Sequence, residues 1–292
     1  MVLRPRRSVL YMPGSNARAL DKAKQLPADV LILDLEDAVA PDAKIAAREQ
    51  VTKAVRDGGY GKRELIIRIN TLDTQWGADD IKAVAAAEPD GVLLPKVAGA
   101  ADIERATDAL RRAGAPEKTK LWAMMETPLG LVHAPEIAAT ARHAGARLAC
   151  FVLGLNDLHK ETRAEVMPDR LSAIYWLSAC ITAARAYGID ILDSVFNNFR
   201  DIDGYRRECV QGRQLGFDGK TLIHPDQIAA ANEVFSPSDA EVAAARKIVA
   251  AFELPENNGK GVINLEGRMV ELLHADIARR TVAIADAIAA RA

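Results

Sequence analysis

Eight short apolar runs, alternating with longer amphipathic segments, constrain the fold of this chain more than any other feature. The runs cover residues 8–12, 30–36, 65–70, 91–97, 121–127, 148–154, 190–196 and 219–225. Near-continuous apolar strands separated by helices are typical of parallel sheets that are buried on both faces. Eight repeats within about 235 residues favour a closed (β/α)8 TIM barrel over an open doubly wound sheet. The PGSN turn after the first run also lacks the glycine pattern of a dinucleotide-binding fold.

The pattern changes after residue 235, which predicts two domains: a catalytic barrel over residues 1–235 and a C-terminal extension over residues 236–292. The SPSD sequence at 236–239 is typical of a helix start. A β-hairpin is expected around Glu266-Gly267, followed by an alanine-rich helix from about His274. We expect the extension to act as a lid that packs on its own barrel or on a neighbouring subunit.

Composition narrows the class of protein. The chain of 292 residues is 49% apolar and 27% charged, and its net charge of −2 gives no indication of a nucleic-acid partner. It contains no apolar run of 18 residues, so no membrane span is expected, and no signal peptide is apparent. Cys150, Cys180 and Cys209 have no metal-binding spacing, so we expect buried free thiols and a reducing, cytoplasmic location.

Polar residues cluster where the predicted strands end, which is the edge of a barrel that carries its active site. They are Glu36, Asp37, Arg68, Asn70, Lys96, Glu126, Thr127, Asn156, Asp157, Asp193, Asn197 and His224. Period-two alternation places Arg68 and Asn70 on one strand face, and Met124 and Glu126 on another. Few polar residues that could take part in catalysis lie at the opposite ends of the predicted strands.

Two of these residues, Glu126 and Asp157, follow neighbouring apolar runs. A carboxylate at the mouth of a buried strand must be paired, hydrated or bound to a metal, because bare burial costs several kcal/mol. Two such groups on neighbouring strands indicate a hard-cation site that suits Mg²⁺, or Mn²⁺ in its place. The alternative is that each acid caps a helix or pairs with a base.

An ordered set of motifs then resembles a known family. The motifs are LYMPGSNARALDKA, LILDLEDAVAPDAK, IRINTLDTQWG, LLPKV, METPLG, GLNDL, GFDGKTLIHP and EGRMVE. In this order, and over essentially the whole chain, they resemble the citrate lyase β-subunit-like group of the HpcH/HpaI aldolase superfamily. That group includes malyl-CoA, β-methylmalyl-CoA and citramalyl-CoA lyases. The resemblance implies a TIM barrel, an Mg²⁺-dependent carbon–carbon lyase, and a homotrimer or hexamer.

The resemblance also implies roles for the acidic residues and the arginine. It assigns Glu126 and Asp157 to the metal, and Arg68 to the carboxylate of the substrate. A planar guanidinium suits a carboxylate, although Arg68 paired with Glu36 or Asp37 inside the barrel is the alternative. Glu36 and Asp37 would act as catalytic acids that hold metal-bound waters, or would form a purely structural network.

The resemblance places further substrate contacts on the loops at the ends of the strands. The backbone near Leu155 and Asn156, after a bend at Gly154, would hold the oxygens of the 2-oxo acid. Tyr11 and Lys22 lie where related lyases contact coenzyme A. A solvated lysine on the first helix is the alternative for Lys22.

The tail contains one departure from the family pattern. The family has an aspartate in a G-x-[ML]-[IV]-D sequence that reaches an adjacent subunit, whereas this chain has Glu271 there. The additional methylene moves the carboxylate by about 1.5 Å, and misplacement by about 1 Å can cost on the order of 10²-fold in rate. Glu271 is expected to be the catalytic base, and a surface glutamate at a helix start is the alternative.

The predicted activity is reversible cleavage of a 3-hydroxy-dicarboxylyl-CoA thioester into an acyl-CoA and a 2-oxo acid. A citrate lyase β subunit acting on an acyl-carrier-bound citryl thioester is one alternative, and a CoA-free 2-oxo acid aldolase is another. A non-catalytic ligand-binding protein and a thioesterase side activity also stay open. A Schiff base on Lys96 or Lys220 is disfavoured, because the strand-end carboxylates favour a metal-assisted enolate.

Overall fold

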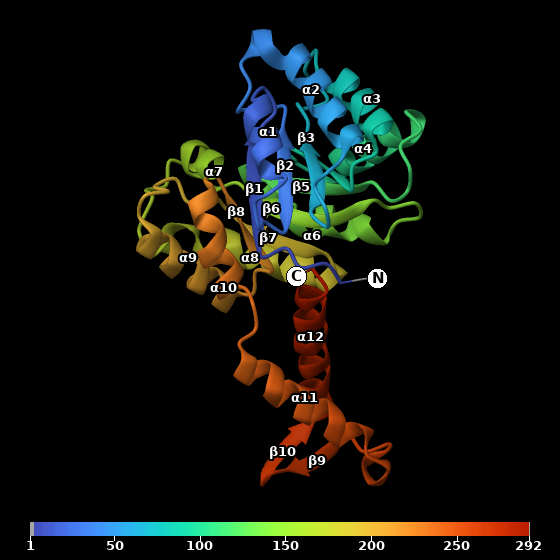
Figure 1. Ribbon diagram of the computed structural model, residues 1–292, viewed down its shortest axis with the longest axis vertical. Coiled ribbons are helices and arrows are strands. Elements are labelled where there is room, and N and C mark those ends of the chain that lie inside the picture. Colours follow the sequence, from blue (N-terminus) through green and yellow to red (C-terminus); the bar gives the residue numbers. More distant parts are fainter. Residues whose placement is uncertain (1–2, 292) are drawn as a thin grey trace. The chain divides into compact units, whose positions relative to one another are not determined.

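The computed structural model describes residues 3–291. These residues form two compact units. The first runs from Arg6 to Asn232, and the second comprises the chain from Glu233 onward together with the residues before Arg6. Each unit is described separately, with the element labels of Figure 1.

The first unit is a closed barrel of parallel strands, as predicted (Figure 1). Each strand pairs with the next along the chain, and β1 pairs with β8 to close the cylinder. The strands are β1 (Ser8–Pro13), β2 (Val30–Asp34), β3 (Glu64–Arg68), β4 (Gly91–Leu94), β5 (Lys120–Met125), β6 (Leu148–Leu153), β7 (Asp190–Asp193) and β8 (Gly219–Leu222).

Helices follow the strands in chain order. They are α1 (Ala17–Ala23), α2 (Lys44–Asp57), α3 (Gly77–Ala87), α4 (Ala100–Arg112), α5 (Pro128–Val132), α6 (Ala134–Ala139), α7 (Leu155–Thr162), α8 (Ile174–Tyr187), α9 (Ile202–Leu215) and α10 (Ile228–Val234). One boundary differs from expectation, because the helix predicted over 169–187 begins only at Ile174. Arg170 has a left-handed backbone, φ +56°, which is incompatible with a continuous helix.

Apolar side chains from alternate strand positions fill the barrel interior. They are Val9, Val30, Ile32, Ile66, Leu93, Trp122, Met124, Ala149, Cys150, Val152 and Leu192. The register places Ile32 beside Ile66 and, one layer further along the strands, Asp34 beside Arg68. The core therefore ends in a polar layer at the carboxyl ends of the strands. The three cysteines are buried and free, as predicted.

A buried ion pair closes the opposite end of the barrel. Arg6 donates two hydrogen bonds to Glu64, at 2.8 and 2.7 Å, and also pairs with Asp190. Its guanidinium lies 4.8 Å from the ring centre of Trp122. Arg6 is thus bonded to both acids at the amino-terminal rim, and the acid cluster considered below lies at the other rim.

The second unit contains α11 (Asp239–Glu253), a hairpin of β9 (Val262–Leu265) and β10 (Arg268–Glu271), and α12 (Leu272–Ala289). The helix start predicted at SPSD is confirmed, with Ser238 as the cap of α11, and Glu241 returns the bond. Glu266 and Gly267 both have positive φ, as required by the tight turn of a hairpin. Ala251, Ile263 and Val270 form a small core. Within residues 3–291, no helix has both the length and the apolar character needed to cross a membrane.

Candidate active site at the carboxyl-terminal rim

Arg68 is buried at the end of β3 and is surrounded by acids. Its Nε and Nη2 donate to the two oxygens of Asp34, at 2.7 and 2.6 Å. Its Nη1 lies 3.0 Å from Glu36 Oε2 and 3.7 Å from Asp37 Oδ2, and the ring centre of Tyr11 lies 4.9 Å from the guanidinium. One edge of the arginine is therefore held rigidly by Asp34, while Nη1 lies on the side of the other acids.

Glu126 directly follows β5 and is 1% exposed. Its Oε1 accepts the backbone N–H of Lys96 at 2.7 Å. Burial, with the charges of Glu36 and Asp157 adding to it and Lys96 opposing it, raises the pKa of Glu126 to about 7. The positive charge of Lys96 is therefore too little to offset the burial of the ionised carboxylate.

Lys96 connects the two predicted metal ligands. Its Nζ lies 3.6 Å from Asp157 Oδ1 and 3.5 Å from Glu36 Oε1, while its own N–H binds Glu126. Its backbone has φ +52°, a conformation that is unfavourable for a residue with a side chain. Glu126 and Asp157 therefore lie on the same rim and around the same cation.

Gly154 allows this approach. It precedes the first residue of α7 with φ −118°, so its backbone does not require a glycine. A Cβ at this position would lie 2.5 Å from Glu126 Cβ and 2.8 Å from Glu126 Oε2. Glycine is needed for space, because the turn that carries Asp157 packs directly on Glu126.

The turn after β2 is held from outside the barrel. Lys44 Nζ donates to the carbonyls of Leu35 and Glu36 at 2.9 and 2.7 Å, and Asn70 Nδ2 donates to the Leu35 carbonyl at 3.0 Å. Burial lowers the pKa of Lys44, although neighbouring acids oppose the shift. These bonds fix the backbone that presents Glu36 and Asp37.

The charges and donor atoms of this cluster fit a hard divalent cation. Its carboxylates are Asp34, Glu36, Asp37, Glu126 and Asp157, and its cations are Arg68, Lys44 and Lys96. Negative charge is therefore in excess when all are ionised. Glu36 Oε2 is also buried without a hydrogen-bond partner.

The number of protein ligands is small. Within residues 3–291, no three His, Cys, Asp or Glu side chains are grouped so that they could hold an ion by themselves. Mg²⁺ commonly takes one or two protein carboxylates and completes its shell with water and substrate oxygens. The pair of Glu126 and Asp157 is consistent with that mode of binding.

Comparison with known proteins identifies the family. Residues 7–225 match the HpcH/HpaI aldolase/citrate lyase family. The chain belongs to this family. A (3S)-malyl-CoA thioesterase of Cereibacter sphaeroides is 51% identical over 98% of this chain and 96% of its own length. The citrate lyase β subunit of Escherichia coli is 38% identical over 92% of this chain and 89% of its own length.

Similarity to solved structures agrees with this assignment. CitE from Mycobacterium tuberculosis, in complex with magnesium, acetoacetate and coenzyme A, is 30% identical with a TM-score of 0.72. The match covers 94% of this chain and 97% of CitE. RipC from Yersinia pestis is 29% identical with a TM-score of 0.68, over 81% of this chain and 97% of RipC. The protein is therefore an enzyme of the citrate lyase β/HpcH class, and the resemblance found in the sequence is confirmed.

The other residues predicted to bind substrate or coenzyme A differ in where they lie relative to this cluster. Tyr11 lies inside the mouth against Arg68, and burial raises the pKa of its phenol above the usual range. Lys22 is exposed on α1. The Asn156 side chain exchanges hydrogen bonds with Asn197 at 2.8 and 3.3 Å. The N–H of Leu155, expected to contact substrate, instead donates to Ser194 Oγ at 3.0 Å.

Glu271 belongs to the second unit. It is the residue before α12, and its N–H donates to Nδ1 of His274 at 2.9 Å. This bond explains why α12 begins at Leu272, two residues earlier than expected. Glu271 therefore lies at a helix start, as in the alternative considered for it. The role of Glu271 as a catalytic base stays a prediction.

Lys220 lies where a Schiff base cannot form. Its side chain is fully buried, and Nζ donates to Asp193, Glu208 and the carbonyl of Ser194. A lysine in this position has no access to a carbonyl substrate. Lys96, which is 39% exposed, has the role of a counter-ion to the acids.

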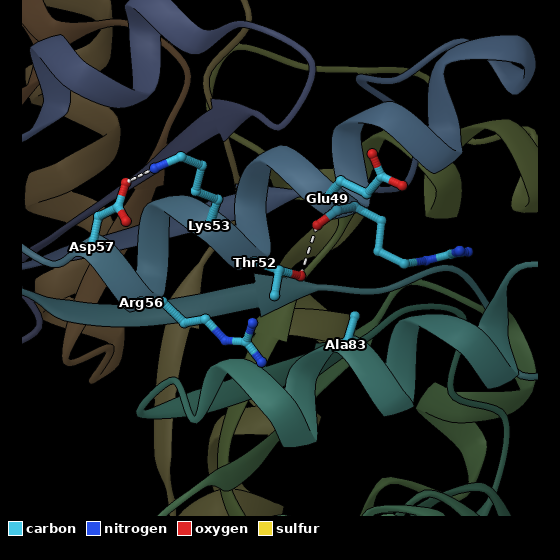
Figure 2. A pocket seen from close by; sticks show the side chains of 7 residues that line it. Glu49, Thr52, Lys53, Arg56, Asp57 and Ala83 are labelled. Atoms are coloured by element: carbon cyan, nitrogen blue, oxygen red, sulfur yellow. Dashed lines mark hydrogen bonds and ion pairs between the residues drawn. The ribbon is translucent and has the colours of Figure 1, made fainter.

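A second depression lies away from this rim. It has a volume of about 540 Å³ and is lined by Arg48, Glu49, Thr52, Lys53, Arg56, Asp57 and Ala83 (Figure 2). Lys53 pairs with Asp57, and Arg56 donates to the carbonyl of Ala86 at 3.1 Å. Because its lining residues lie on α2 and α3, this depression has no strand-end acids for chemistry.

Three residues important to the site escaped the sequence analysis: Asp34, Ser194, and Lys96 in its role as counter-ion. A signal for Asp34 existed, because it lies two residues beyond Ile32 on the same strand face and thus at the level of Arg68. Ser194 gave no comparable signal.

Proposed function

We propose that this enzyme uses Mg²⁺ to hydrolyse a 3-hydroxy-dicarboxylyl-CoA thioester such as (3S)-malyl-CoA to the free acid and coenzyme A. The observation that carries the proposal is the juxtaposition of Arg68 with the under-neutralised pair Glu126 and Asp157. An arginine edge suits the free carboxylate of the substrate, and the acid pair suits a divalent cation. Hydrolysis is favoured over cleavage because the thioesterases are 50–51% identical to this chain and the citrate lyase β subunits 35–38%.

The proposed roles follow from the contacts. Glu126 and Asp157 would hold Mg²⁺, which supplies positive charge to a substrate oxygen. Arg68, oriented by Asp34, would hold the free carboxylate through its remaining edge. Burial raises the pKa of Glu36 against the opposing charge of Arg68, and Glu36 Oε2, which has an ion pair with Arg68 but no hydrogen-bond partner, would accept a proton from water. The water oxygen then bonds to the thioester carbon, the carbon–sulfur bond breaks, and the thiolate takes up the proton.

Carbon–carbon cleavage is the second candidate, favoured by the similarity to citrate lyase β subunits over 92% of this chain. In that reaction a base removes the hydroxyl proton of malyl-CoA, and the bond between the two central carbons breaks. The electron pair passes to the acetyl thioester, which takes up a proton, and glyoxylate is released. An acyl-carrier-bound citryl thioester and a free 2-oxo acid are the alternative substrates.

Products decide between these candidates. We expect purified enzyme with (3S)-malyl-CoA and Mg²⁺ to release free thiol and malate in equal amounts, without glyoxylate. EDTA should reduce the rate by about 10²-fold or more, because the metal supplies several kcal/mol of charge stabilisation, and Mg²⁺ or Mn²⁺ should restore it. Activity that is indifferent to chelation contradicts the metal, and glyoxylate with acetyl-CoA in place of malate contradicts hydrolysis.

A substitution at Glu271 tests whether the C-terminal extension takes part in the reaction. If its carboxylate serves carbon–carbon chemistry, Glu271→Asp should raise the ratio of glyoxylate to thiol by about tenfold or more, because a shift of about 1 Å alters such a step strongly. Glu266→Gln, in the same hairpin and paired only with Lys247 among its described contacts, is the control and should leave the ratio unchanged. An unchanged ratio in Glu271→Asp removes Glu271 from the reaction. The homotrimer or hexamer expected from the family resemblance stays a prediction.

A further inference from the structure

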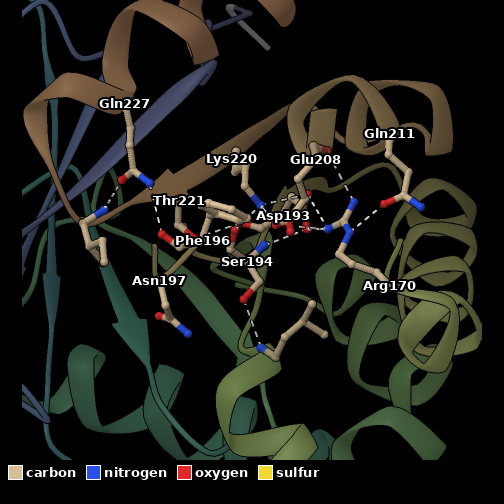
Figure 3. A network of polar contacts seen from close by, with 12 residues as sticks. Arg170, Asp193, Ser194, Phe196, Asn197, Glu208, Gln211, Lys220, Thr221 and Gln227 are labelled. Carbon is tan, nitrogen blue, oxygen red and sulfur yellow. Dashed lines mark hydrogen bonds and ion pairs between the residues drawn. The ribbon is translucent and has the colours of Figure 1, made fainter. Parts of the chain in front are cut away.

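Four charged residues form a cluster in which Asp193 of β7 and Lys220 of β8 meet Glu208 of α9 and Arg170, and all but Glu208 are buried (Figure 3). Arg170 Nη1 donates to both oxygens of Asp193, at 2.7 and 2.8 Å. Lys220 Nζ lies 3.2 Å from Asp193 Oδ2 and 2.6 Å from Glu208 Oε1. Asp193 and Lys220 are completely buried, and Arg170 is 3% exposed. We call these four residues the buried quartet.

The buried quartet contains two acids and two bases, so its charges balance. Gln211 accepts from Arg170 Nε at 2.7 Å, and Thr221 donates to the carbonyl of Asp193 at 2.9 Å. A balanced and fully bonded cluster has no free proton acceptor or donor for a substrate. Its burial is costly unless its geometry is nearly ideal, which suggests that it holds a particular backbone in place.

That backbone is Ser194, which is also completely buried. Its N–H donates to Asp193 Oδ1 at 2.8 Å, and its carbonyl accepts from Lys220 Nζ. Both backbone groups of Ser194 are thus bonded to the buried quartet. The remaining polar atom, Oγ, points to α7 and accepts the N–H of Leu155 at 3.0 Å (Figure 3).

This bond satisfies the first N–H group of α7, at a helix start where the local sequence supplies no side-chain oxygen. Gly154 occupies the capping position of α7 and has no side chain. The first N–H groups of a helix have no partner within the helix, and a side-chain oxygen at the capping position normally accepts that of the second or third helical residue. Gly154 cannot be exchanged for a serine, because a Cβ would collide with Glu126. Ser194 provides the oxygen from a neighbouring strand instead.

The consequence concerns Asp157, which lies in the first turn of α7, two residues after Leu155. We propose that Ser194 is a positioning residue that sets Asp157 relative to Glu126, and that the buried quartet holds Ser194 in place. The proposal rests on the Mg²⁺ site of the proposed function. Groups behind metal ligands typically alter metal affinity by about 10- to 100-fold when removed.

The test compares Ser194→Ala with Ser8→Ala. Ser8 is an equally buried serine at the opposite end of the barrel, whose Oγ accepts the backbone N–H of Asp29 at 3.1 Å and also donates to Asn232 Oδ1 at 2.7 Å. Two measurements are made on each full-length variant. The first is hydrogen exchange at the Leu155 amide without metal, and the second is calorimetric titration with Mg²⁺ alone.

We expect Ser194→Ala to speed Leu155 exchange by about tenfold or more, because a local bond is lost. The Mg²⁺ dissociation constant should rise by about 10- to 100-fold. Ser8→Ala should leave both values within about twofold while lowering the melting temperature at least as much, because it loses the bond to Asn232 as well as the one from Asp29.

Two results overturn the inference: unchanged Leu155 exchange in Ser194→Ala, or equal loss of Mg²⁺ affinity in both variants. If the unmodified enzyme binds no Mg²⁺, the proposed function is wrong, and Ser194 cannot act on a metal site. Hydrogen exchange at Leu155 then still decides whether Ser194 holds α7. Replacing Lys220 is not used as the primary test, because it leaves buried acids unpaired and endangers folding.

Discussion

Glu126→Gln is expected to abolish Mg²⁺-dependent turnover and, in metal-free protein near pH 8, to raise the free energy of unfolding. The two effects have one cause. Glu126 is nearly buried, and burial raises its pKa to about 7 from 4.5. An ionised carboxylate there is unfavourable without a metal, whereas glutamine is neutral and keeps the oxygen that accepts the N–H of Lys96. The expected gain is on the order of 3 kcal/mol, since each pKa unit is about 1.4 kcal/mol.

The sign follows from proton binding. Between about pH 4.5 and pH 7 the folded protein binds the Glu126 proton more tightly than the unfolded chain does. The free energy of unfolding of the metal-free parent should therefore fall as pH rises through this window, and it should lack this component in Glu126→Gln. Mg²⁺ affinity should follow the opposite course, falling about tenfold per pH unit below pH 7, because the ion competes with the proton.

Urea unfolding in EDTA, at about pH 5 and about pH 8, measures the stability difference. Glu136→Gln, an exposed carboxylate on α6, is the control and should change stability little at either pH. A Glu126→Gln variant that is no more stable than the parent near pH 8, or that keeps its Mg²⁺-dependent turnover, would contradict the assignment of Glu126.

Arg68→Met should cost about 3–5 kcal/mol of stability near neutral pH, because removal of one partner leaves buried charge unpaired. Asp34 is 1% exposed and loses both of its hydrogen bonds to Arg68. Glu36 loses its nearest cation at the same time. Turnover should also fall, by about 10³-fold or more in kcat/KM, if the arginine holds the substrate carboxylate, since such charged pairs are worth several kcal/mol.

A second substitution separates the two effects. Asp34→Asn in the Arg68→Met background removes the main unpaired charge and should recover much of the lost stability, as measured by urea unfolding. It should not recover kcat/KM, because the substrate still lacks its cation. Arg68→Lys should be intermediate, since an ammonium keeps the charge but cannot make the two parallel bonds to Asp34. Activity of Arg68→Met within tenfold of the parent would exclude Arg68 from substrate binding.

The barrel was predictable because hydrophobic periodicity is local. Each apolar run marks one buried strand, and the change of pattern after residue 235 marks the extension. The acids Glu126 and Asp157 were found for a related reason, since each follows the end of a run, and parallel strands bring their carboxyl ends to one rim. The hairpin turn at Glu266 and Gly267 was equally local.

The missed features depend on distance across the fold. The alternative weighed for Arg68 was a pair with Glu36 or Asp37, and both lie beside its Nη1. Its main partner is nevertheless Asp34, because the register of two strands places them side by side. Leu155 was expected to offer its amide to substrate, but Ser194, 39 residues later, accepts that bond.

The sequence alone thus predicted the barrel, its polar rim and the two acids of the candidate site, since these features depend on the spacing of neighbouring residues. The partners of those acids emerged only on folding, among them the cation beside Asp157 and the serine that caps its helix. The physical reason is that a charge or a hydrogen bond is satisfied by whatever lies within about 3–4 Å, and neighbours at that range come from strands far apart in the sequence.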